Sequence, residues 1–456
     1  MHVPPDIVSA AITDLAELVA IPSVSARAEG LDSCAQKIAD LLAEAGFHTE
    51  IHPGDVGPFV VGEAGDGPFT LVIYNHYDVQ PEDPIQLWTD PPFVLSLRDD
   101  RLYGRGAADD KGEFTSRLAG WRCFRAQNSE PLPFKLIWIV EGEEEIGSPS
   151  LTRFLEHRFP DLRADLCWWE FGEVDKSGRP IVLMGFKGIL AVELECQTAR
   201  ADLHSSLGAI FDNPLWRLAS AISSLRDKSG RILIDGFYDE VVQPDAKSSI
   251  LAATPPFPLE DLQAETGGRR LLDGIDAGNF YRHLNMEPCL NVNGFHGGYG
   301  GEGAKTVLPF AGTAKLDFRL VPGQHPVRMA ELLRDHLDAK GFEDITVKVL
   351  DAEVLGVRSD PSHVVVDLGA ALLEKWFGRP VVIQPSSAAS GLAYPFVHRF
   401  GATLFGAGLT HHGAMLHSPD ENILVSHLEN MIGFSADFFR GLGEAVRAGQ
   451  EVLSDD

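Results

Sequence analysis

The chain has 456 residues and a mass of 49.6 kDa, a length typical of two or three domains. Its 38 Lys and Arg oppose 66 Asp and Glu, and the net charge of −28 repels nucleic acid and anionic membranes. No apolar stretch is long enough to cross a bilayer, Met1–Ala20 contains no basic leader, and the five cysteines form no CxxC pair. We therefore expect a cytoplasmic protein with neither a nucleic-acid nor a membrane partner.

The first part of the chain alternates between helix and strand patterns. Apolar spacing predicts helices over 6–20 and 34–46. Strand and helix patterns then follow one another in the order strand 69–74, helix 113–127, strand 134–140, helix 148–158 and strand 165–169. This alternation is typical of a mostly parallel sheet that is covered by helices on both faces.

The pattern changes in the middle of the chain. Ile189–Glu195 and Ala311–Phe318 alternate apolar and polar residues, which favours an antiparallel sheet with one wet face. Helical spacing returns over 214–225 and 326–340, whereas 227–285 is polar and gives no clear pattern. These features predict an inserted α+β unit.

The α/β pattern resumes in the last part of the chain. The predicted elements are helix 363–376, strands 380–384 and 402–405, and helix 422–445. We therefore predict an α/β catalytic domain with a mostly parallel, doubly wound sheet, formed by residues 1–189 and 353–456. The inserted α+β domain covers residues 190–352.

Acidic and His residues follow several of the predicted strands. Those that follow a strand directly or lie in a loop between the elements are His76, Asp78, Asp109, Asp110, the run Glu141-Gly142-Glu143-Glu144-Glu145, Glu170 and His417. Ligands in open α/β sheets bind beyond the carboxyl ends of the strands. We therefore expect these side chains to meet at one edge of the sheet.

The residue types at this edge favour a metal site. Carboxylates that are crowded together in a low dielectric repel one another, and a bound cation would relieve that repulsion. For the Glu run taken alone, a solvated acidic loop is the alternative interpretation. A ligating imidazole such as His76 needs a partner on its second nitrogen, and Asp78 is close in sequence. Two His and several carboxylates match the ligands of a zinc-like pair.

Other chemistries find little support in the sequence. Gly298-x-Gly300-x-x-Gly303 matches the dinucleotide fingerprint as a string, but a predicted strand follows it where a helix is needed. No G-x-S-x-G sequence is present, which argues against a serine hydrolase.

Seven segments in fixed order carry a family resemblance. They are His76–Pro81, Tyr103–Gly112, Glu141–Ser148, Asp202–Ser205, Lys305–Pro309, Arg319–Pro322 and His417–Asn422. In these segments the chain resembles the M20-type co-catalytic zinc peptidases over nearly its whole length. This group includes cytosolic dipeptidases, glutamate carboxypeptidases, aminoacylases and succinyl-diaminopimelate desuccinylases.

The resemblance implies a role for each matching residue at a centre of two divalent ions. Asp109 would bridge the two ions, which we expect to be zinc, with cobalt or manganese as alternatives. His76 and Glu170 would complete the ligand set of one ion, and Glu145 and His417 would complete that of the other. Glu144 would be the general base that acts on the attacking water, and Asp78 would orient His76.

The resemblance also implies roles for the inserted domain, as a ferredoxin-like lid that forms a homodimer. His204 would reach the partner's active site and stabilise the oxyanion. Arg319 would hold the free carboxylate of the substrate. Thr306, Asn293 and Gly391 would line the substrate pocket.

Three functional hypotheses remain open. The leading one is a dipeptidase or carboxypeptidase that cleaves short peptides with a free C-terminus. The second is an N-acyl-amino-acid amidohydrolase, because Glu170 stands where many dipeptidases of the family have Asp, although His76–Pro81 is closer to the dipeptidase branch. The third is a non-catalytic homologue that binds without turnover. A small peptide or an N-acyl amino acid is the expected substrate.

Overall fold

The computed structural model describes residues 2–449, and these fall into two compact units. Of the described residues, 2–184, 359–384 and 395–449 belong to the first unit, and Gly185–Arg358 and Pro385–Tyr394 form the second. The predicted inserted domain begins at 190 and ends at 352, a few residues inside the second unit. The segment 385–394, which we predicted as part of the catalytic domain, belongs to the second unit in the structure. There, Ser387 N donates to Gly185 O at 2.8 Å.

The described part of the first unit contains an eight-stranded mixed sheet in the order β1-β2-β6-β3-β7-β19-β9-β18. Its strands are β1 (His48–His52), β2 (Phe59–Ala64), β3 (Phe69–His76), β6 (Phe134–Glu141), β7 (Leu166–Trp169), β9 (Ile181–Leu183), β18 (Val382–Gln384) and β19 (Thr403–Gly406). The pairs β3–β6, β3–β7, β7–β19 and β9–β18 are parallel. The carboxyl ends of β3, β6 and β7 therefore lie at one edge, and the predicted α/β class is confirmed.

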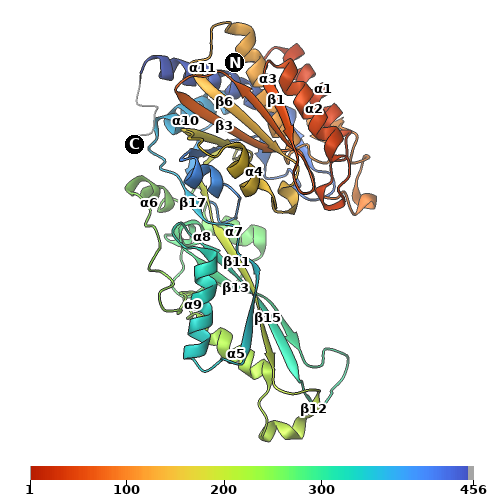
Figure 1. Cartoon of the computed structure of the whole chain (residues 1–456), viewed down its shortest axis with the longest axis vertical. Helices are drawn as coiled ribbons and strands as arrows, with labels where there is room; N and C mark the ends of the chain where they lie inside the picture. Colours follow the sequence, from red (N-terminus) through yellow and green to blue (C-terminus); the bar gives the residue numbers. More distant parts are fainter. Residues whose placement is uncertain (1, 450–456) are drawn as a thin grey trace. The chain divides into compact units, whose positions relative to one another are not determined.

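Helices cover this sheet. They are α1 (Pro5–Val19), α2 (Leu31–Glu44), α3 (Lys111–Gln127), α4 (Leu151–Arg158), α10 (Val364–Phe377) and α11 (Val425–Arg447). Helix α3 contacts both α1 and α11, and α10 packs on α11 (Figure 1). Among the described residues, every helix is too short or too polar to span a membrane.

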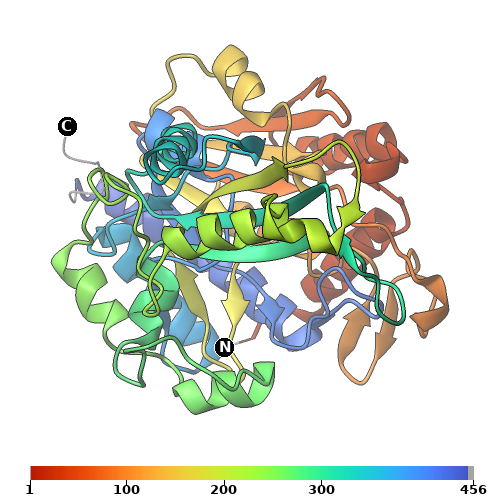
Figure 2. The ribbon, with the colours of Figure 1, turned by 90° about the horizontal axis from the view of Figure 1, so that it is seen from below.

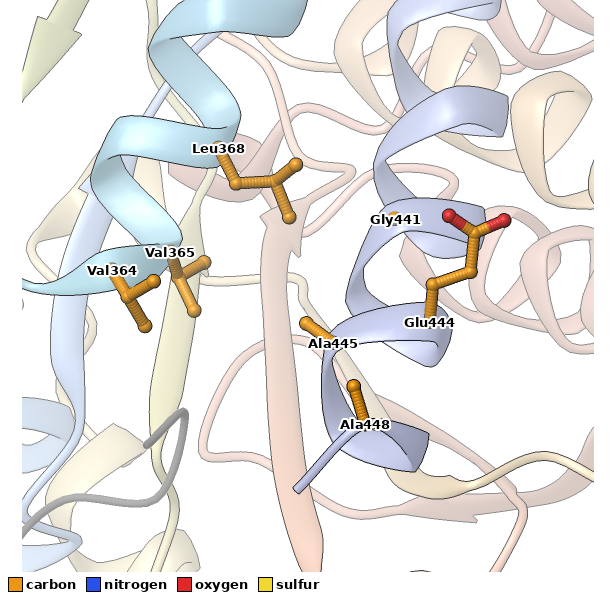
Figure 3. Close-up of a pocket in the computed structure, with 7 residues that line it drawn as sticks. All are labelled: Val364, Val365, Leu368, Gly441, Glu444, Ala445 and Ala448. Carbon is orange, nitrogen blue, oxygen red and sulfur yellow. The ribbon is translucent and has the colours of Figure 1, made fainter. Parts of the chain in front are cut away.

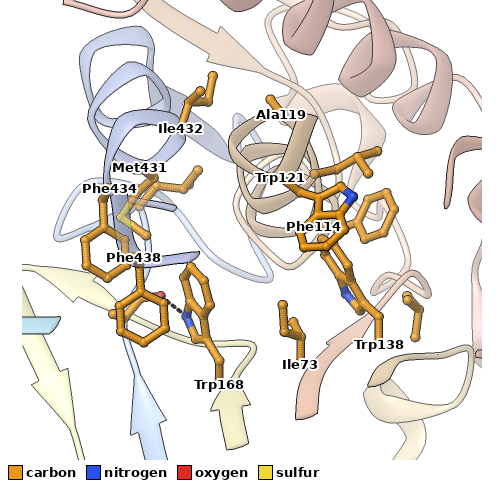
Figure 4. Close-up of a cluster of buried hydrophobic side chains, with 14 of the residues drawn as sticks. Ile73, Phe114, Ala119, Trp121, Trp138, Trp168, Met431, Ile432, Phe434 and Phe438 are labelled. Atoms are coloured by element: carbon orange, nitrogen blue, oxygen red, sulfur yellow. Dashed lines mark hydrogen bonds between the residues drawn. The ribbon is translucent and has the colours of Figure 1, made fainter. Parts of the chain in front are cut away.

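Large aromatic side chains join the sheet to the helices. Trp168 of β7 packs edge-on against Phe434 and Phe438 of α11, and its indole N–H donates to Ala407 O at 3.0 Å (Figure 4). Trp138 of β6 packs on the α3 side of the core. Buried aromatic rings contribute large apolar area, so these contacts keep the strand ends in a rigid frame.

Three predicted helices begin three residues later or earlier than expected, each for a local reason. Helix α2 begins at Leu31 rather than 34, because its first turn is largely polar and adds little to the apolar periodicity. Helix α4 begins at 151 rather than 148, because Ser148 has a left-handed φ of 52°. Helix α11 begins at 425 rather than 422, because Asn422–Leu424 forms strand β21 against β5 (Arg101–Tyr103).

The second unit contains an antiparallel sheet in the order β13-β15-β11-β16. Its strands are β11 (Gly188–Gln197), β13 (Cys289–Gly297), β15 (Ala311–Leu320) and β16 (Ile345–Asp351). Along β11, Leu190, Val192 and Leu194 are buried and alternate with less buried residues, as the sequence predicts. Helices α5 (Pro214–Leu225) and α9 (Pro326–Ala339) pack on this sheet, and Figure 2 shows α5 across β11 and β15.

The segment 227–285, which gave no pattern in the sequence, forms three short helices. They are α6 (Ala246–Ala252), α7 (Leu259–Thr266) and α8 (Phe280–Met286). Leu259, Phe280 and Tyr281 make a small apolar cluster of their own. The apolar side chains of this cluster are unevenly spaced in a polar segment and produce no helical periodicity, so the sequence pattern does not predict these helices.

Candidate metal centre

Several candidate ligands lie where the sheet topology predicts them. His76 is the last residue of β3, and Glu170 follows β7 directly. Glu144 and Glu145 form a short 3-10 turn after β6, and Asp109 lies in the loop before α3. Because β6, β3 and β7 are adjacent and parallel, their ends bring these acidic and imidazole groups to one edge.

Asp109 lies between two histidines that are distant in sequence. Its Oδ1 is 2.9 Å from His76 Nε2, and its Oδ2 is 3.1 Å from His417 Nε2. Each carboxylate oxygen thus faces a different imidazole, an arrangement that suits a carboxylate shared between two ions.

The described residues form two groups that could each hold a metal ion. One consists of His76, Asp110 and Glu170, and the other of Asp109, Glu145 and His417; in each, the ligand atoms lie within 4.8 Å of one another. Asp110 was not among the ligands expected from the sequence. Its Oδ2 accepts from Asn75 Nδ2 at 2.6 Å and His76 N at 3.0 Å, so that oxygen is already committed to holding the end of β3.

The donor set fits divalent cations. All donors are imidazole nitrogens or carboxylate oxygens, which suit zinc, cobalt and manganese. Glu170 Oε2 is buried and has no hydrogen-bond partner among the described residues, and it lies 4.0 Å from His76 Nε2. A buried, unpaired carboxylate oxygen is costly, and a bound cation would remove that cost.

Asp78 supports two of the neighbouring residues. His76 Nδ1 lies 3.0 Å from the backbone oxygen of Asp78 and 3.4 Å from its Oδ1. The carboxylate of Asp78 also accepts from the backbone N–H groups of Glu144 at 3.1 Å and Glu145 at 3.0 Å. One buried side chain therefore positions both the end of β3 and the Glu turn.

The electrostatics of the cluster reflect burial and pairing. Burial raises the pKa of Asp110 to about 7 and that of Glu144 to about 8. Hydrogen bonds with Asp109 and Glu145 raise the pKa of His417 to about 10. Burial opposes ionisation of Asp109, but the contacts with His417 and His76 hold its pKa below its usual range. The imidazoles take the place of cations in the metal-free cluster.

Glycines allow the chain to bend tightly behind Asp109. Gly106 has a left-handed φ of 83°, which favours glycine. A Cβ on Gly112 would lie 2.0 Å from Ala107 O, so only glycine fits between this loop and the start of α3. These observations explain two of the three glycines in the Tyr103–Gly112 segment.

The predicted substrate residues His204 and Thr306 lie together in the second unit. His204 pairs with Val307, which follows Thr306, in the short sheet of β12 (Leu203–His204) and β14 (Val307–Leu308). The backbone N–H of Ser206 donates to His204 Nδ1 at 3.2 Å. The neutral imidazole therefore carries its proton on Nε2, where it can act as a donor.

Arg319 and Gly391 also lie close together in the second unit. Arg319 Nη1 donates to Ser390 Oγ at 2.8 Å and Nε to Asp317 Oδ2 at 3.2 Å. A Cβ on Gly391 would approach the Phe186 ring to 3.1 Å. Asn293, in contrast, is exposed on β13, and its side-chain oxygen accepts from Asn291 Nδ2 at 2.8 Å.

Comparison with known proteins identifies the family. A model of peptidase family M20/M25/M40 matches residues 72–440. The chain belongs to this family. The resemblance that the seven sequence segments indicate is thereby confirmed.

This M20 peptidase is similar to several characterised proteins. It is 28% identical to the Cys-Gly metallodipeptidase of Schizosaccharomyces pombe, over 86% of both chains. It is 31% identical to the human Beta-Ala-His dipeptidase, over 62% of this chain and 56% of the relative. The structure of an M20 family metallo-carboxypeptidase from Sulfolobus solfataricus has a TM-score of 0.84 and 34% identity, covering 94% of this chain and 98% of that one.

Two cavities of this M20 peptidase lie outside the ligand cluster. One, of about 310 Å³, lies between α10 and α11 (Figure 3) and is lined by Val364, Val365, Leu368, Gly441, Glu444, Ala445 and Ala448. The other, of about 880 Å³, lies in the second unit and is lined largely by the segment 229–289. Neither contains a predicted catalytic or metal-binding residue.

Sequence reasoning assigned no role to three buried charged residues around the cluster, although it placed Asp110 at this edge of the sheet. Asp110 holds the end of β3, Arg117 of α3 contacts several strand ends, and Glu421 contacts the loop before Asp109. Asp110 and Glu421 lie inside segments that carry the family resemblance, so attention to every charged residue of those segments would have found them. Arg117 lies on a helix outside these segments and carries no sequence signal.

Proposed function

We propose that this M20 peptidase is a metal-dependent peptidase that cleaves dipeptides or short peptides with a free C-terminal carboxylate. The observation that carries the proposal is Asp109, whose two oxygens face the imidazoles of His76 and His417. The similarity to two named dipeptidases supports dipeptides as the first substrates to test.

Two divalent ions, zinc in the first instance, would occupy the cluster. His76, Asp109 and Glu170 would hold one ion, and Asp109, Glu145 and His417 the other. When bound, such a pair lowers the pKa of a coordinated water and polarises the scissile carbonyl group. The side chains of the cluster supply the rest of the chemistry.

Glu144 is the general base in this proposal. It is next to Glu145 in sequence, and its electrostatic environment includes His76, Asp109 and Asp78. Its carboxylate would accept the proton of the attacking water and later deliver that proton to the leaving amine. The backbone N–H of Glu144 donates to the Asp78 carboxylate at 3.1 Å, which fixes the backbone position from which the Glu144 side chain extends.

The substitution Glu144→Gln tests this assignment. We expect kcat to fall by about 10²–10⁴-fold while both ions stay bound, because the variant loses a proton acceptor and no ligand. Glu145→Gln is the matched control, since it removes a neighbouring carboxylate that would hold an ion. Ion content measured on both variants distinguishes the roles: loss of an ion in Glu144→Gln, with none lost in Glu145→Gln, would reverse them.

The second unit would supply substrate contacts. Arg319 Nη2 has no hydrogen-bond partner among the described residues, so its guanidinium can still bind a substrate carboxylate. His204 Nε2–H would donate to the oxyanion. Thr306, Asn293 and Gly391 would line the pocket; of these, Gly391 has the strongest support, because it follows the Ser390 that holds Arg319.

A homodimer formed through the second unit is part of the proposal. Ile210, Phe211 and Trp216 lie near the start of α5 and are 75%, 51% and 73% exposed. Large apolar side chains grouped on a surface favour contact with another protein surface. A second copy of this chain is the expected partner.

An N-acyl-amino-acid amidohydrolase is the second candidate function. Glu170, at a position where many dipeptidases of the family have Asp, favours it. Amine release from matched dipeptides and from N-acetyl or N-succinyl amino acids, by metal-loaded protein with a chelator control, separates the two. Cleavage confined to dipeptides supports the peptidase, and cleavage confined to the acylated set supports the amidohydrolase. Absence of any turnover and of ion binding would support the non-catalytic alternative.

A further inference from the structure

Glu421 is a buried carboxylate that is not a candidate ligand. Both Glu421 and its partner Arg105 are 1% exposed, and Arg105 Nη1 donates to Glu421 Oε2 at 2.7 Å. The same oxygen accepts from Gly106 N at 3.0 Å. A buried charge pair with this many partners needs a reason, because removing two charges from water is costly.

The second oxygen of Glu421 holds the ligand loop itself. Its Oε1 accepts from Ala108 N at 2.8 Å and Asp109 N at 3.0 Å, and its backbone oxygen accepts from Gly104 N at 3.0 Å. The loop that presents Asp109 therefore wraps around one carboxylate. Charge-assisted hydrogen bonds of this kind are stronger than neutral ones.

The segment that carries Glu421 also carries His417. Between them the backbone is held in an unusual form, since His417 and Asp420 have φ values of 56° and 60°. Left-handed conformations at residues other than glycine are costly and persist only where the surroundings hold them. Thr89 donates two hydrogen bonds to the Asp420 carboxylate. The Glu421 carboxylate accepts four hydrogen bonds and holds the segment more firmly.

We propose that Glu421 is a positioning residue that locks Asp109 to His417 and thereby sets the affinity for one ion of the pair. The inference rests on the two-ion centre proposed above. The ion it concerns is the one that Asp109, Glu145 and His417 would hold. Glu421 acts on it through the backbone of Asp109 and through the short segment 417–421.

A different residue supports the other ion. Arg117 of α3 is fully buried and donates to Tyr74 O at 3.2 Å, and to Trp169 O and Glu170 O at 2.7 Å each. It thus ties the end of β3, which carries His76, to the end of β7, which precedes Glu170. The ion held by His76 and Glu170 therefore keeps most of its support when Glu421 is changed.

The test is Glu421→Gln, with Zn²⁺ alone as the probe. In glutamine, the amide nitrogen would face the donors Arg105 Nη1 and Gly106 N if its oxygen kept the bonds from Ala108 and Asp109. Substitutions of this kind lower metal affinity by about 10–100-fold. We expect this loss for the ion of Asp109, Glu145 and His417, and a smaller loss for the other ion, which shares Asp109. Both are measured as bound Zn²⁺ per chain across buffered free Zn²⁺ concentrations.

Double variants identify which ion is affected. In His417→Ala, adding Glu421→Gln should change the affinity of the remaining ion less, because Arg117 holds the strand ends that carry its ligands His76 and Glu170. In His76→Ala, the same addition should lower the affinity of the remaining ion by about 10–100-fold. Equal weakening of both ions, or unchanged affinity in Glu421→Gln, would overturn the inference.

Asp437→Asn is the matched control for loss of a partly buried carboxylate. Asp437 accepts from Lys375 Nζ at 2.7 Å and Trp376 Nε1 at 2.9 Å, within the first unit and away from the candidate ligands. We expect its Zn²⁺ affinities to equal those of the unsubstituted protein. Glu421→Asp, which keeps the charge but shortens the side chain, provides a second variant with a smaller disturbance of Arg105.

The outcomes separate this inference from the function on which it rests. Fewer than two Zn²⁺ ions in the unsubstituted protein would count against the two-ion centre itself. Two ions there and two equally tight ions in Glu421→Gln would reject only the role of Glu421. If both Glu421 variants lose their cooperative unfolding transition while Asp437→Asn keeps it, Glu421 holds the fold rather than the ligands, and the inference is wrong.

Discussion

At the scale of single residues, the cluster is a set of like charges kept together by burial and by two imidazoles. Asp109 is stabilised as an anion by His76 and His417, while burial favours protonated Asp110 and Glu144. Without cations, the repulsion within this set lowers the free energy of unfolding. Metal binding and protonation are alternative ways of relieving the same repulsion.

This balance predicts how pH affects the metal-free protein. The folded pKa is about 7 for Asp110, about 8 for Glu144 and about 10 for His417, whereas the pKa of unfolded carboxyl and imidazole groups is about 4 and about 6.5. The folded state therefore holds extra protons on the two carboxyl groups from about pH 4 up to their folded pKa, and on His417 from about pH 6.5 up to about 10. Stability falls as pH rises through these intervals, which include the range from about pH 6 to 8. Thermal unfolding with a chelator should show a Tm that decreases over this range.

Excess Zn²⁺ should reverse the trend, because the ion replaces the lost protons and binds the folded state alone. Glu144→Gln should make the decrease in Tm shallower in the metal-free protein, since the variant has one carboxyl group fewer to ionise. A metal-free Tm that rises between pH 6 and pH 8 would contradict the burial argument.

At the scale of elements, tight loops at the strand ends determine which side chains can meet. The loop from Gly104 to Gly112 is closed by Glu421 and by contacts that exclude a Cβ at Gly112. The helix that follows, α3, starts from this loop and packs on α1 and α11. Loop and helix therefore form one rigid support for Asp109.

The substitution Gly112→Ala tests the rigidity of this support. The added methyl group would lie 2.0 Å from Ala107 O, so the loop must shift. Overpacking of this kind costs about 1–3 kcal/mol, and Zn²⁺ affinity should fall together with stability. Gly300→Ala is the control, because a Cβ there would meet no atom within 4 Å. Unchanged Zn²⁺ affinity in Gly112→Ala would show that the loop tolerates the shift.

At the scale of the whole molecule, the proposed chemistry is divided between two units. The candidate ligands and Glu144 belong to the first unit, whereas His204 and Arg319 belong to the second. A role of His204 in the partner's active site therefore predicts complementation between variants. Inactive Glu144→Ala mixed with inactive His204→Ala should regain activity, because a heterodimer contains one site with both residues intact.

Subunit exchange must be verified in this mixture, for example with differently tagged chains. Recovery of up to about a quarter of the native activity is expected if exchange is random and each site is independent. A mixture of Glu144→Ala with Glu144→Gln provides the matched control and should regain none. Verified exchange without recovery would contradict a shared site.

The residue pattern alone predicted a mostly parallel sheet in the first unit, an antiparallel sheet in the second and the types of residue at the candidate site. Strand patterns such as 69–74 and 134–140 are local, because burial on both faces needs a continuous apolar run. The residues after those strands, His76 and Glu144 among them, were therefore expected at one sheet edge. The family segments then indicated which of them would act as ligands and which as base.

How these residues face one another depends on the tertiary fold. Asp109 and His417 are 308 positions apart, and Glu421 and Arg105 are 316 apart, so no local pattern links them. Their contacts depend on how β21 pairs with β5 and on how the loops close. Whether a buried charge serves as ligand, anchor or base depends on hydrogen-bond geometry, which arises from packing and carries no periodic signal in the sequence.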